Sequence, residues 1–320
     1  MSSQSFPLLN LPCLALLHVV RMFEVKELVP LSLVSSQAKY IVKHYRNKSL
    51  GLHLSLMGGL HPTVVLRKQD CYPNVVRIIV KPLSTAQPHE LQIVPHDDHE
   101  FETYWNNEVR GTEVLLEYLC DLFGIIVKQV TLWRNEVWML DLVEKMQGSS
   151  YVATVLGDEK LSNNKLRHIL FKLNPPSLII ASPSSSFRIK NFRRKYDVFH
   201  LSSGTWLTMD NLLQLDCIEI TITTKKKFTS QEMECYIRHV LTGGAPRLRE
   251  FCARVEDGAA VFALLEAMPE LSTGEEERHV DGPRWVLITK MKREDGMVKI
   301  SIEYGFCHHM IALTVKEIAE

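Results

Sequence analysis

Large apolar residues crowd the N-terminal part of this 320-residue chain more densely than short helices can bury them alone. Leu16, Val20 and Phe23 recur at the spacing of one helical face. Leu14 and Leu17 fall on a different face of the same helix. The whole set comprises Leu8, Leu9, Leu11, Leu14, Leu16, Leu17, Val19, Val20, Met22, Phe23, Val25, Leu28, Val29, Leu31, Leu33 and Val34. Either the rest of the chain or a partner must therefore cover part of this apolar surface.

Proline and serine residues indicate where the helices of this region begin. Pro12 favours the start of a first helix, and Pro30 favours the start of a second helix over residues 29–35. Ser35 can cap a third helix over residues 37–45. We therefore expect three short helices in the first 48 residues.

Charge and composition exclude several classes of protein. The chain has 37 Lys and Arg against 37 Asp and Glu, whereas a dedicated nucleic-acid binder normally has a cationic excess. Its 46% hydrophobic content is that of a globular chain, and its length predicts about two domains. The seven cysteines form no CxxC pair, which favours free thiols in a reducing compartment. The apolar run 8–20 lacks a basic leader and is too short for a membrane span, so we expect an intracellular protein of the cytoplasm or nucleus, without membrane contact.

The remaining chain alternates between strand and helix patterns, which predicts an α+β fold. Apolar alternation and β-branched runs predict strands over 50–56, 63–66, 74–80, 125–132, 178–181, 218–222, 285–289, 297–304 and 310–315. Asp295-Gly296 predicts a hairpin turn, residues from 266 onward begin with an acidic loop, and residues 114–122 predict an amphipathic helix. Strand–turn–helix units of this kind are compatible with an irregular leucine-rich-repeat-like solenoid.

Two short runs stand in order near the N-terminus, FPLLNLP at residues 6–12 and ELVPLSLVS at residues 27–35. With the apolar helix between them and the basic segment 39–46, they resemble an F-box. The sequence departs from the usual pattern at Cys13, where many F-boxes carry an acidic residue. The resemblance implies docking onto the Skp-family adaptor of a cullin-based ubiquitin ligase.

A second resemblance lies further along the chain. WLTMDNLLQLDC at 206–217 precedes the expected strand 218–222, and FTSQE at 228–232 and GGAPRL at 243–248 follow. This order resembles the type-two F-box-associated domain, a non-enzymatic family greatly expanded in nematodes and found after F-boxes. Cys235 and Val240 stand where its helix usually carries an asparagine and a tryptophan.

The residues of this segment support a helix independently of the resemblance. Thr229 or Ser230 can cap it, with Glu232 completing a capping-box-like start. Its apolar stripe is Met233, Tyr236, Ile237, Val240 and Leu241. Gly243 marks its end.

Candidate metal sites and nucleophiles are weakly supported. The cluster His96-Asp97-Asp98-His99-Glu100 follows Pro95, which favours a solvated turn over a metal site. Cys307-His308-His309 lies in or beside a strand, where neighbouring side chains point to opposite faces. No GxSxG or phosphate-loop motif is present, and Ser182–Ser186 is typical of a loop. We expect no catalytic residue, metal or cofactor.

The sequence therefore predicts a helical F-box over 1–48, a strand-rich connecting segment over 49–95, and a mixed α/β substrate-recognition domain over 96–320. The F-box-associated region occupies about 195–255. The predicted partners are a Skp-family adaptor, through it a cullin ligase, and a target protein of unknown identity. The residues expected to dock the adaptor are Leu9, Leu11, Pro12, Leu16, Val20, Phe23, Leu28, Leu31 and Val34.

Two alternatives stay open. The first is a non-catalytic interaction protein whose F-box-like helices engage no ligase. The second is nucleic-acid binding through the basic run 188–195, in which Phe187 and Phe192 interleave with cations. Both this run and Lys225–Lys227 are also typical of solvated faces.

Overall fold

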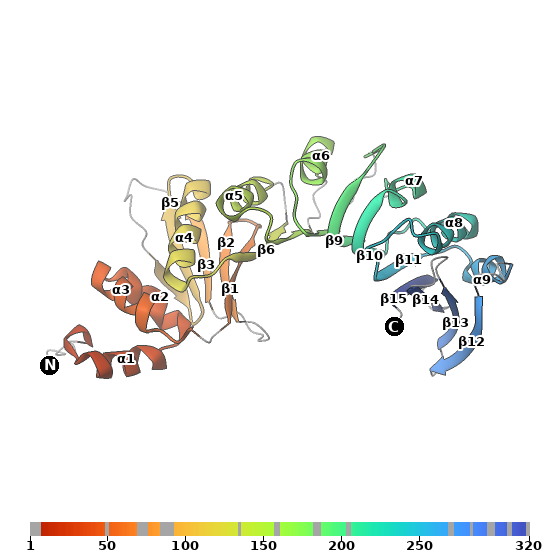
Figure 1. Ribbon diagram of the computed structural model, residues 1–320. Coiled ribbons are helices and arrows are strands. Elements are labelled where there is room, and N and C mark those ends of the chain that lie inside the picture. Colours follow the sequence, from red (N-terminus) through yellow and green to blue (C-terminus); the bar gives the residue numbers. More distant parts are fainter. Residues whose placement is uncertain are drawn as a thin grey trace. The chain divides into compact units, whose positions relative to one another are not determined.

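The computed structural model describes residues 8–48, 51–68, 76–83, 93–133, 136–156, 161–181, 187–202, 206–267, 272–281, 284–292, 298–305 and 309–317. The chain divides into two compact units, Met1–Tyr151 and Val152–Glu320 (Figure 1). The fold is mixed α/β, as predicted, with helices first and then strands and helices.

The first unit opens with a short 3₁₀ turn, η1 (Leu8–Asn10), followed by α1 (Cys13–Met22), α2 (Val25–Leu33) and α3 (Ser36–Tyr45). These helices share a small apolar core, made of Leu16, Val20, Val25, Leu28, Val29, Ala38, Ile41 and Val42. The predicted third helix is confirmed, because Ser35 Oγ accepts a hydrogen bond from Ala38 N at 3.1 Å at its start.

The predicted start of the second helix is wrong. We expected it at residue 29, but α2 begins at Val25 and contains Pro30 in its interior. The backbone N–H of Glu24 donates to Glu27 Oε2 at 2.8 Å, so an acidic capping box starts the helix one turn before the proline. Pro30 removes one helical hydrogen bond, which a nine-residue helix packed on α3 tolerates.

A six-stranded sheet follows in the first unit. Its strands are β1 (Leu52–Met57), β2 (Thr63–Lys68), β3 (Val76–Pro82), β4 (Val94–Asp97), β5 (Glu100–Trp105) and β6 (Val127–Leu132), in the order β6-β1-β2-β3-β5-β4. Strand β1 pairs in parallel with β6, and β3 pairs in parallel with β5. Helix α4 (Glu108–Phe123) packs on β2, β3 and β5, and α5 (Trp138–Gln147) packs on β6. The hairpin β4–β5 lies where only a turn was expected.

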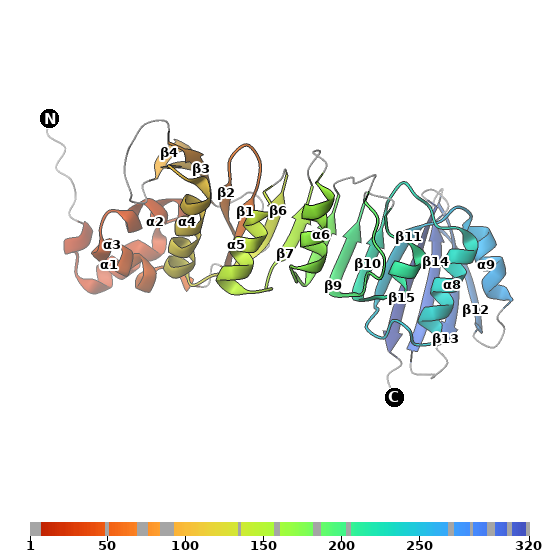
Figure 2. The ribbon, with the colours of Figure 1, turned by 90° about the horizontal axis from the view of Figure 1, so that it is seen from above.

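The second unit begins with five strands that pair in parallel in chain order: β7 (Val152–Val155), β8 (Ser177–Ile180), β9 (Arg194–Leu201), β10 (Leu215–Ile222) and β11 (Glu250–Arg254). Helices α6 (Asn163–Phe171), α7 (Met209–Leu212) and α8 (Ser230–Leu241) connect them. These helices lie on one side of the sheet (Figure 2). Parallel strands stacked in chain order, with helices on one side, form the arrangement of an irregular solenoid.

The parallel run ends where β15 (Met310–Glu317) pairs antiparallel with β11. Strands β14 (Val298–Gly305), β13 (Arg284–Lys292) and β12 (Ser272–Asp281) extend this antiparallel end, and α9 (Gly258–Glu266) precedes them. The three predicted C-terminal strands correspond to β13, β14 and β15, although residue 297 of the second lies outside the described residues. The expected acidic loop is instead strand β12, and its charged residues are typical of an edge strand. The predicted turn at Asp295-Gly296 lies outside the described residues.

Candidate interaction surfaces

The residues predicted to dock an adaptor divide into three groups by burial. Leu16, Val20 and Leu28 are only 5%, 1% and 1% exposed. They belong to the shared core of helices α1, α2 and α3 and lie beneath the surface of these helices. Leu9, Leu11, Phe23 and Leu31 are half-buried, and Pro12 and Val34 are exposed.

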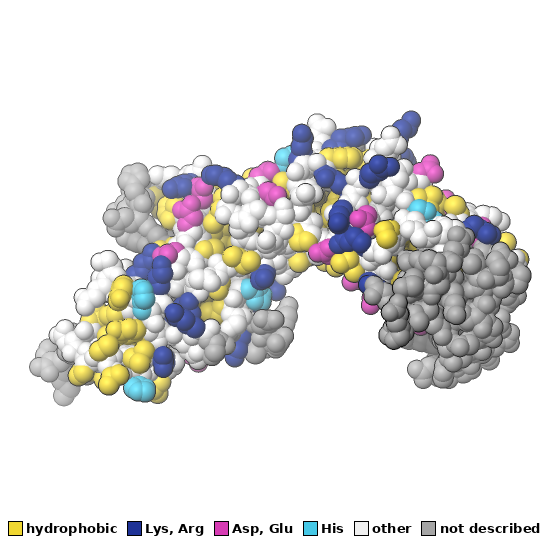
Figure 3. All heavy atoms as spheres, viewed as in Figure 1, with side chains coloured by type: hydrophobic (Ala, Val, Ile, Leu, Met, Phe, Trp, Pro, Cys, Tyr) yellow, Lys and Arg dark blue, Asp and Glu magenta, His cyan; other side chains and the backbone are white. Residues whose placement is uncertain are grey.

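Three exposed apolar residues of the F-box are not among the residues predicted to dock the adaptor. Leu14, Met22 and Tyr40 are 72%, 83% and 59% exposed, and Val34 reaches 72%. Figure 3 shows hydrophobic side chains gathered over α1 on the face in view. The signal for Leu14 was already present in the sequence, because this residue falls off the stripe formed by Leu16, Val20 and Phe23. Its exposed side chain is part of the apolar surplus that the helices do not bury.

An aromatic cluster holds the connections around β9 in the second unit. The Trp206 ring lies 5.5 Å from the Phe187 and Phe192 rings in edge-on geometry, and 6.5 Å from the Phe199 ring. All four side chains are at most 1% exposed. Phe187 and Phe192 therefore cannot stack on bases, which removes the aromatic part of the nucleic-acid hypothesis for the run 188–195.

Helix α8 contacts α7 and begins with the cap that the sequence predicted. Thr229 Oγ1 accepts a hydrogen bond from Glu232 N at 3.2 Å, and Glu232 Oε2 accepts one from Thr229 N at 2.9 Å. The complete predicted stripe of Met233, Tyr236, Ile237, Val240 and Leu241 is buried. Gly243 follows with a φ of 84°.

Comparison with known families assigns both regions. A family model described as an F-box domain matches residues 8–50, and a model described as F-box associated matches residues 186–253. The chain carries an F-box followed by an F-box-associated domain. Both resemblances expected from the sequence are thus confirmed. No curated protein and no solved structure matches the chain.

The two domains are interaction modules and not catalytic domains. The F-box match covers η1 to α3, and the F-box-associated match covers the aromatic cluster together with β9, α7, β10 and α8. Within the described residues, no helix has the length and apolar character needed to cross a membrane.

The F-box is anchored to α4 by its last helix. Arg46, 9% exposed, donates from Nε to the Leu122 carbonyl at 3.3 Å and from Nη2 to the Phe123 carbonyl. Its guanidinium lies 5.3 Å from the centre of the Phe123 ring. These carbonyls belong to the last turn of α4, where acceptors lack helical partners, so Arg46 caps the helix from outside. Gly124, at a φ of 59°, ends the helix directly beside this contact.

Three further polar contacts join the F-box to α4. Lys39 Nζ lies 2.9 Å from Asp121 Oδ2, and Lys43 bonds the other carboxylate oxygen. Hydrogen bonds from Lys43 and Lys39 lower the pKa of Asp121 below its ordinary value. Tyr118 donates to Ser32 Oγ at 2.9 Å. The F-box helices are therefore held on α4 by polar contacts as well as by apolar packing.

A hollow of about 450 Å³ lies beside this anchor. It is lined by Lys43, His44, Arg46, Lys48, Gly51, Leu52, Asp121, Leu122, Phe123, Gly124 and Ile125. Arg46 faces the carbonyl end of α4, and Lys43 faces the carboxylate of Asp121. They balance the partial negative charge of the helix C-terminus, which accounts for their presence without a ligand.

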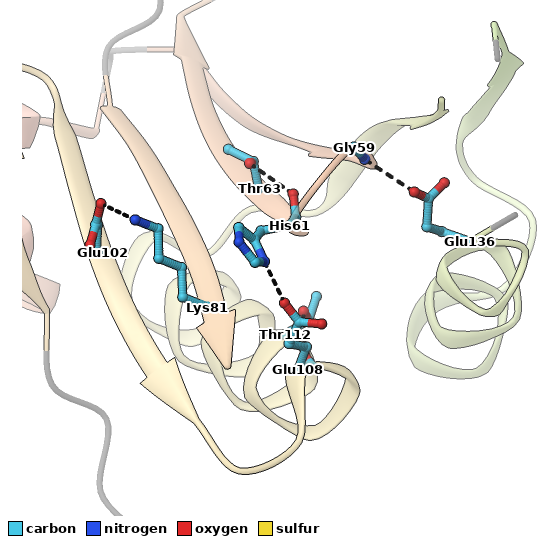
Figure 4. A network of polar contacts seen from close by, with 8 residues as sticks. All are labelled: Gly59, His61, Thr63, Lys81, Glu102, Glu108, Thr112 and Glu136. Carbon is cyan, nitrogen blue, oxygen red and sulfur yellow. Dashed lines mark hydrogen bonds and ion pairs between the residues drawn. The ribbon is translucent and has the colours of Figure 1, made fainter. Parts of the chain in front are cut away.

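Polar contacts elsewhere in the first unit tie loops to helices (Figure 4). His61 Nδ1 lies 2.8 Å from Glu108 Oε1 at the start of α4, and Gly59 N donates to Glu136 Oε1 at 3.2 Å. On the sheet, Lys81 Nζ lies 2.6 Å from Glu102 Oε1, and these bonds with Tyr104 lower the pKa of Glu102. Figure 4 shows each carboxylate directed at its own partner and not toward a shared point.

The candidate metal-binding clusters of the sequence are not assembled in the described residues. In that part of the chain, no three His, Cys, Asp or Glu side chains gather as metal ligands, although His96 Nδ1 approaches Glu102 at 3.3 Å. Asp98 and His99 form the turn between β4 and β5. Ser182–Ser186 and Cys307-His308 lie outside the described residues.

Proposed function

We propose that this chain is a substrate-recognition adaptor of a Skp-cullin-F-box ubiquitin ligase. The F-box binds the Skp-family adaptor, and the second unit binds a target protein. The mechanism is proximity, because holding a target near a ubiquitin-loaded enzyme raises its effective concentration without a reacting group on this chain. A role in this machinery also implies an intracellular location.

The observation that carries the proposal is the unburied apolar surface of the F-box helices. Leu14, Met22 and Val34 each leave more than two thirds of the side chain exposed, although the helices that carry them are well packed. Exposed apolar side chains that cluster on short helices are typical of a binding surface. The predicted docking residues Leu9, Leu11, Phe23 and Leu31 are half-buried in the same F-box.

The test measures adaptor affinity for a variant that changes only exposed residues. Leu14→Asp with Val34→Asp removes apolar contacts of about 2 kcal/mol per side chain, if the partner buries both. The expected loss of affinity is at least a hundredfold, measured by isothermal titration with a purified Skp-family adaptor. Leu11→Ala with Pro12→Ala tests the predicted entry to the F-box in the same assay.

Leu60→Asp is the matched control, since Leu60 is 77% exposed in the same unit but lies on the turn between β1 and β2. It should leave the affinity unchanged. Undiminished adaptor binding by the Leu14/Val34 variant would overturn the docking surface. No binding by the wild-type chain would favour an interaction protein that engages no ligase.

A further inference from the structure

The stretch from α6 into β9 is strongly basic. Residues 161–202 contain the cations Lys165, Arg167, Lys172, Arg188, Lys190, Arg193, Arg194 and Lys195. The only carboxylate in this range is Asp197, whose Oδ1 is bound by Arg247 Nη2 at 2.5 Å. The neutral total charge of the chain therefore conceals a local cationic surface. Figure 3 shows Lys and Arg side chains gathered over α6 and β9.

Contacts between α6 and the segment before β9 bring several of these cations together. Arg167 Nη2 donates to the Arg188 carbonyl at 3.0 Å, and its guanidinium lies 5.4 Å from the Phe187 ring centre. Arg194 Nε donates to the Leu170 carbonyl at 2.6 Å. Two segments that are apart in sequence thus form one surface. We call it the basic patch: Arg167, Phe171, Arg188 and Arg194, flanked in sequence by Lys172 and Arg193.

The guanidinium groups of Arg167 and Arg194 are held in place by contacts other than ion pairs. Arg194 also bonds Asn174 Oδ1 at 3.4 Å and lies 5.8 Å from the Phe171 ring centre. Its Nη2 atom is buried and has no hydrogen-bond partner in the described part of the chain. Carbonyls, an amide and aromatic rings thus orient Arg167 and Arg194, while no described carboxylate pairs with either. Arg194 is half-buried, whereas Arg167 is exposed, so the charge of Arg167 is the one that a partner can reach.

Phe171 gives the basic patch an apolar element. Its side chain is 38% exposed and packs edge-on against Phe192 at 6.0 Å. It lies one helical turn after Arg167, so the two side chains share a face of α6. Arginine beside a rigid, partly exposed aromatic ring is the composition of residues that dominate protein–protein binding energy.

We infer that the basic patch binds a carboxylate-rich segment of the target protein. This inference rests on the proposed function, because it names the chemistry of the target that the second unit receives. The exposed cations Arg167, Lys172 and Arg193 suit several carboxylates along a peptide. Guanidinium groups bind carboxylates through two parallel hydrogen bonds. Of the rings at the basic patch, Phe171 is partly exposed, whereas Phe187 and Phe192 are buried; a single accessible ring favours a peptide over a strand whose successive bases stack.

The test uses the full chain and a defined probe, a fluorescein-labelled 12-residue peptide of alternating Glu and Gly. Fluorescence anisotropy at low salt should detect binding of this peptide and none of the matching Gln–Gly peptide. Arg167→Glu with Lys172→Glu, both exposed in the native chain, should weaken binding at least tenfold. Arg167→Lys with Lys172→Arg should retain most of the affinity, because both charges persist.

Lys225→Glu with Lys227→Glu is the matched control, since it makes the same change of charge elsewhere in the second unit. It should alter the affinity by less than twofold. An equal loss in this control, or equal binding of the Gln–Gly peptide, would overturn the inference. Tighter binding of a 12-nucleotide oligouridylate that Arg167→Glu with Lys172→Glu abolishes would also overturn it, in favour of nucleic acid.

Adaptor affinity measured on the same variants separates this inference from the proposed function. The basic-patch variants should bind the Skp-family adaptor as the wild type does. Normal adaptor binding without peptide binding would refute the basic patch alone. Peptide binding by a chain that binds no adaptor would refute the ligase role alone.

Discussion

Replacing Arg46 by alanine tests how firmly the F-box is anchored to α4. The substitution removes two hydrogen bonds from a charged donor to the Leu122 and Phe123 carbonyls. Each such bond contributes about 1.5–3 kcal/mol, which sets an upper range of about 3–6 kcal/mol. Both residues line the hollow beside the anchor, so water can reach the freed carbonyls and recover part of this energy. We therefore expect a loss of about 2–3 kcal/mol.

Hydrogen exchange monitored by mass spectrometry is the suitable assay, because it resolves the two units of the chain. Amides in the last turns of α3 and α4 should exchange about 30–150 times faster in Arg46→Ala, as the loss of 2–3 kcal/mol requires. Amides of α8 should be unaffected. Lys48→Ala is the control, since Lys48 is exposed and lines the same hollow. Unchanged exchange in α3 and α4 of Arg46→Ala would refute the anchor.

Three further predictions concern stability. Trp206→Ala should destabilise the second unit by about 3–5 kcal/mol, because it empties the centre of the aromatic cluster; faster amide exchange in β9 and β10 should report it, and a change confined to the first unit would contradict it. Thr229→Ala should cost about 1 kcal/mol through loss of the α8 cap, whereas Thr229→Ser should be nearly neutral in the same assay; equal losses in both would contradict the capping role. The pKa of Asp121 is lowered in the folded chain, so its stabilising effect is present above the ordinary pKa of about 4 and is lost as pH falls through the folded pKa. Asp121→Asn should therefore reduce stability at pH 6 and have little effect near pH 2; a deficit that persists undiminished near pH 2 would contradict this linkage.

Local signals predicted the elements whose ends are set by their own side chains. Helix α3 begins where Ser35 caps it, and α8 begins where Thr229 and Glu232 form a capping box. Helix α2 shows the limit of such reasoning, because Pro30 and Glu24 offer competing starts and only the packed structure decides between them. Strand β12 could not be predicted, since its ladder partner β13 and not its own charged sequence makes it a strand.

An apolar surplus on the F-box helices could be predicted from the sequence, but not which of its residues are exposed. Apolar periodicity identifies a helical stripe, and the same stripe can face a core or a partner. Leu16 and Val20 proved to face the core, whereas Leu14 lies off their stripe and is exposed. The basic patch was visible only as a run of cations, because the contacts of Arg167 with the segment before β9 join residues that are distant in sequence.

The contact between Arg46 and α4 has a consequence for how such chains can change during evolution. Its acceptors are main-chain carbonyls, which every amino acid supplies, so replacing the side chains of Leu122 or Phe123 cannot delete them. Only the arginine itself has to be retained. Positions 122 and 123 are therefore free to diverge among descendants without loss of this contact, whereas the contacts of Tyr118 and Asp121 with the F-box require those side chains to persist.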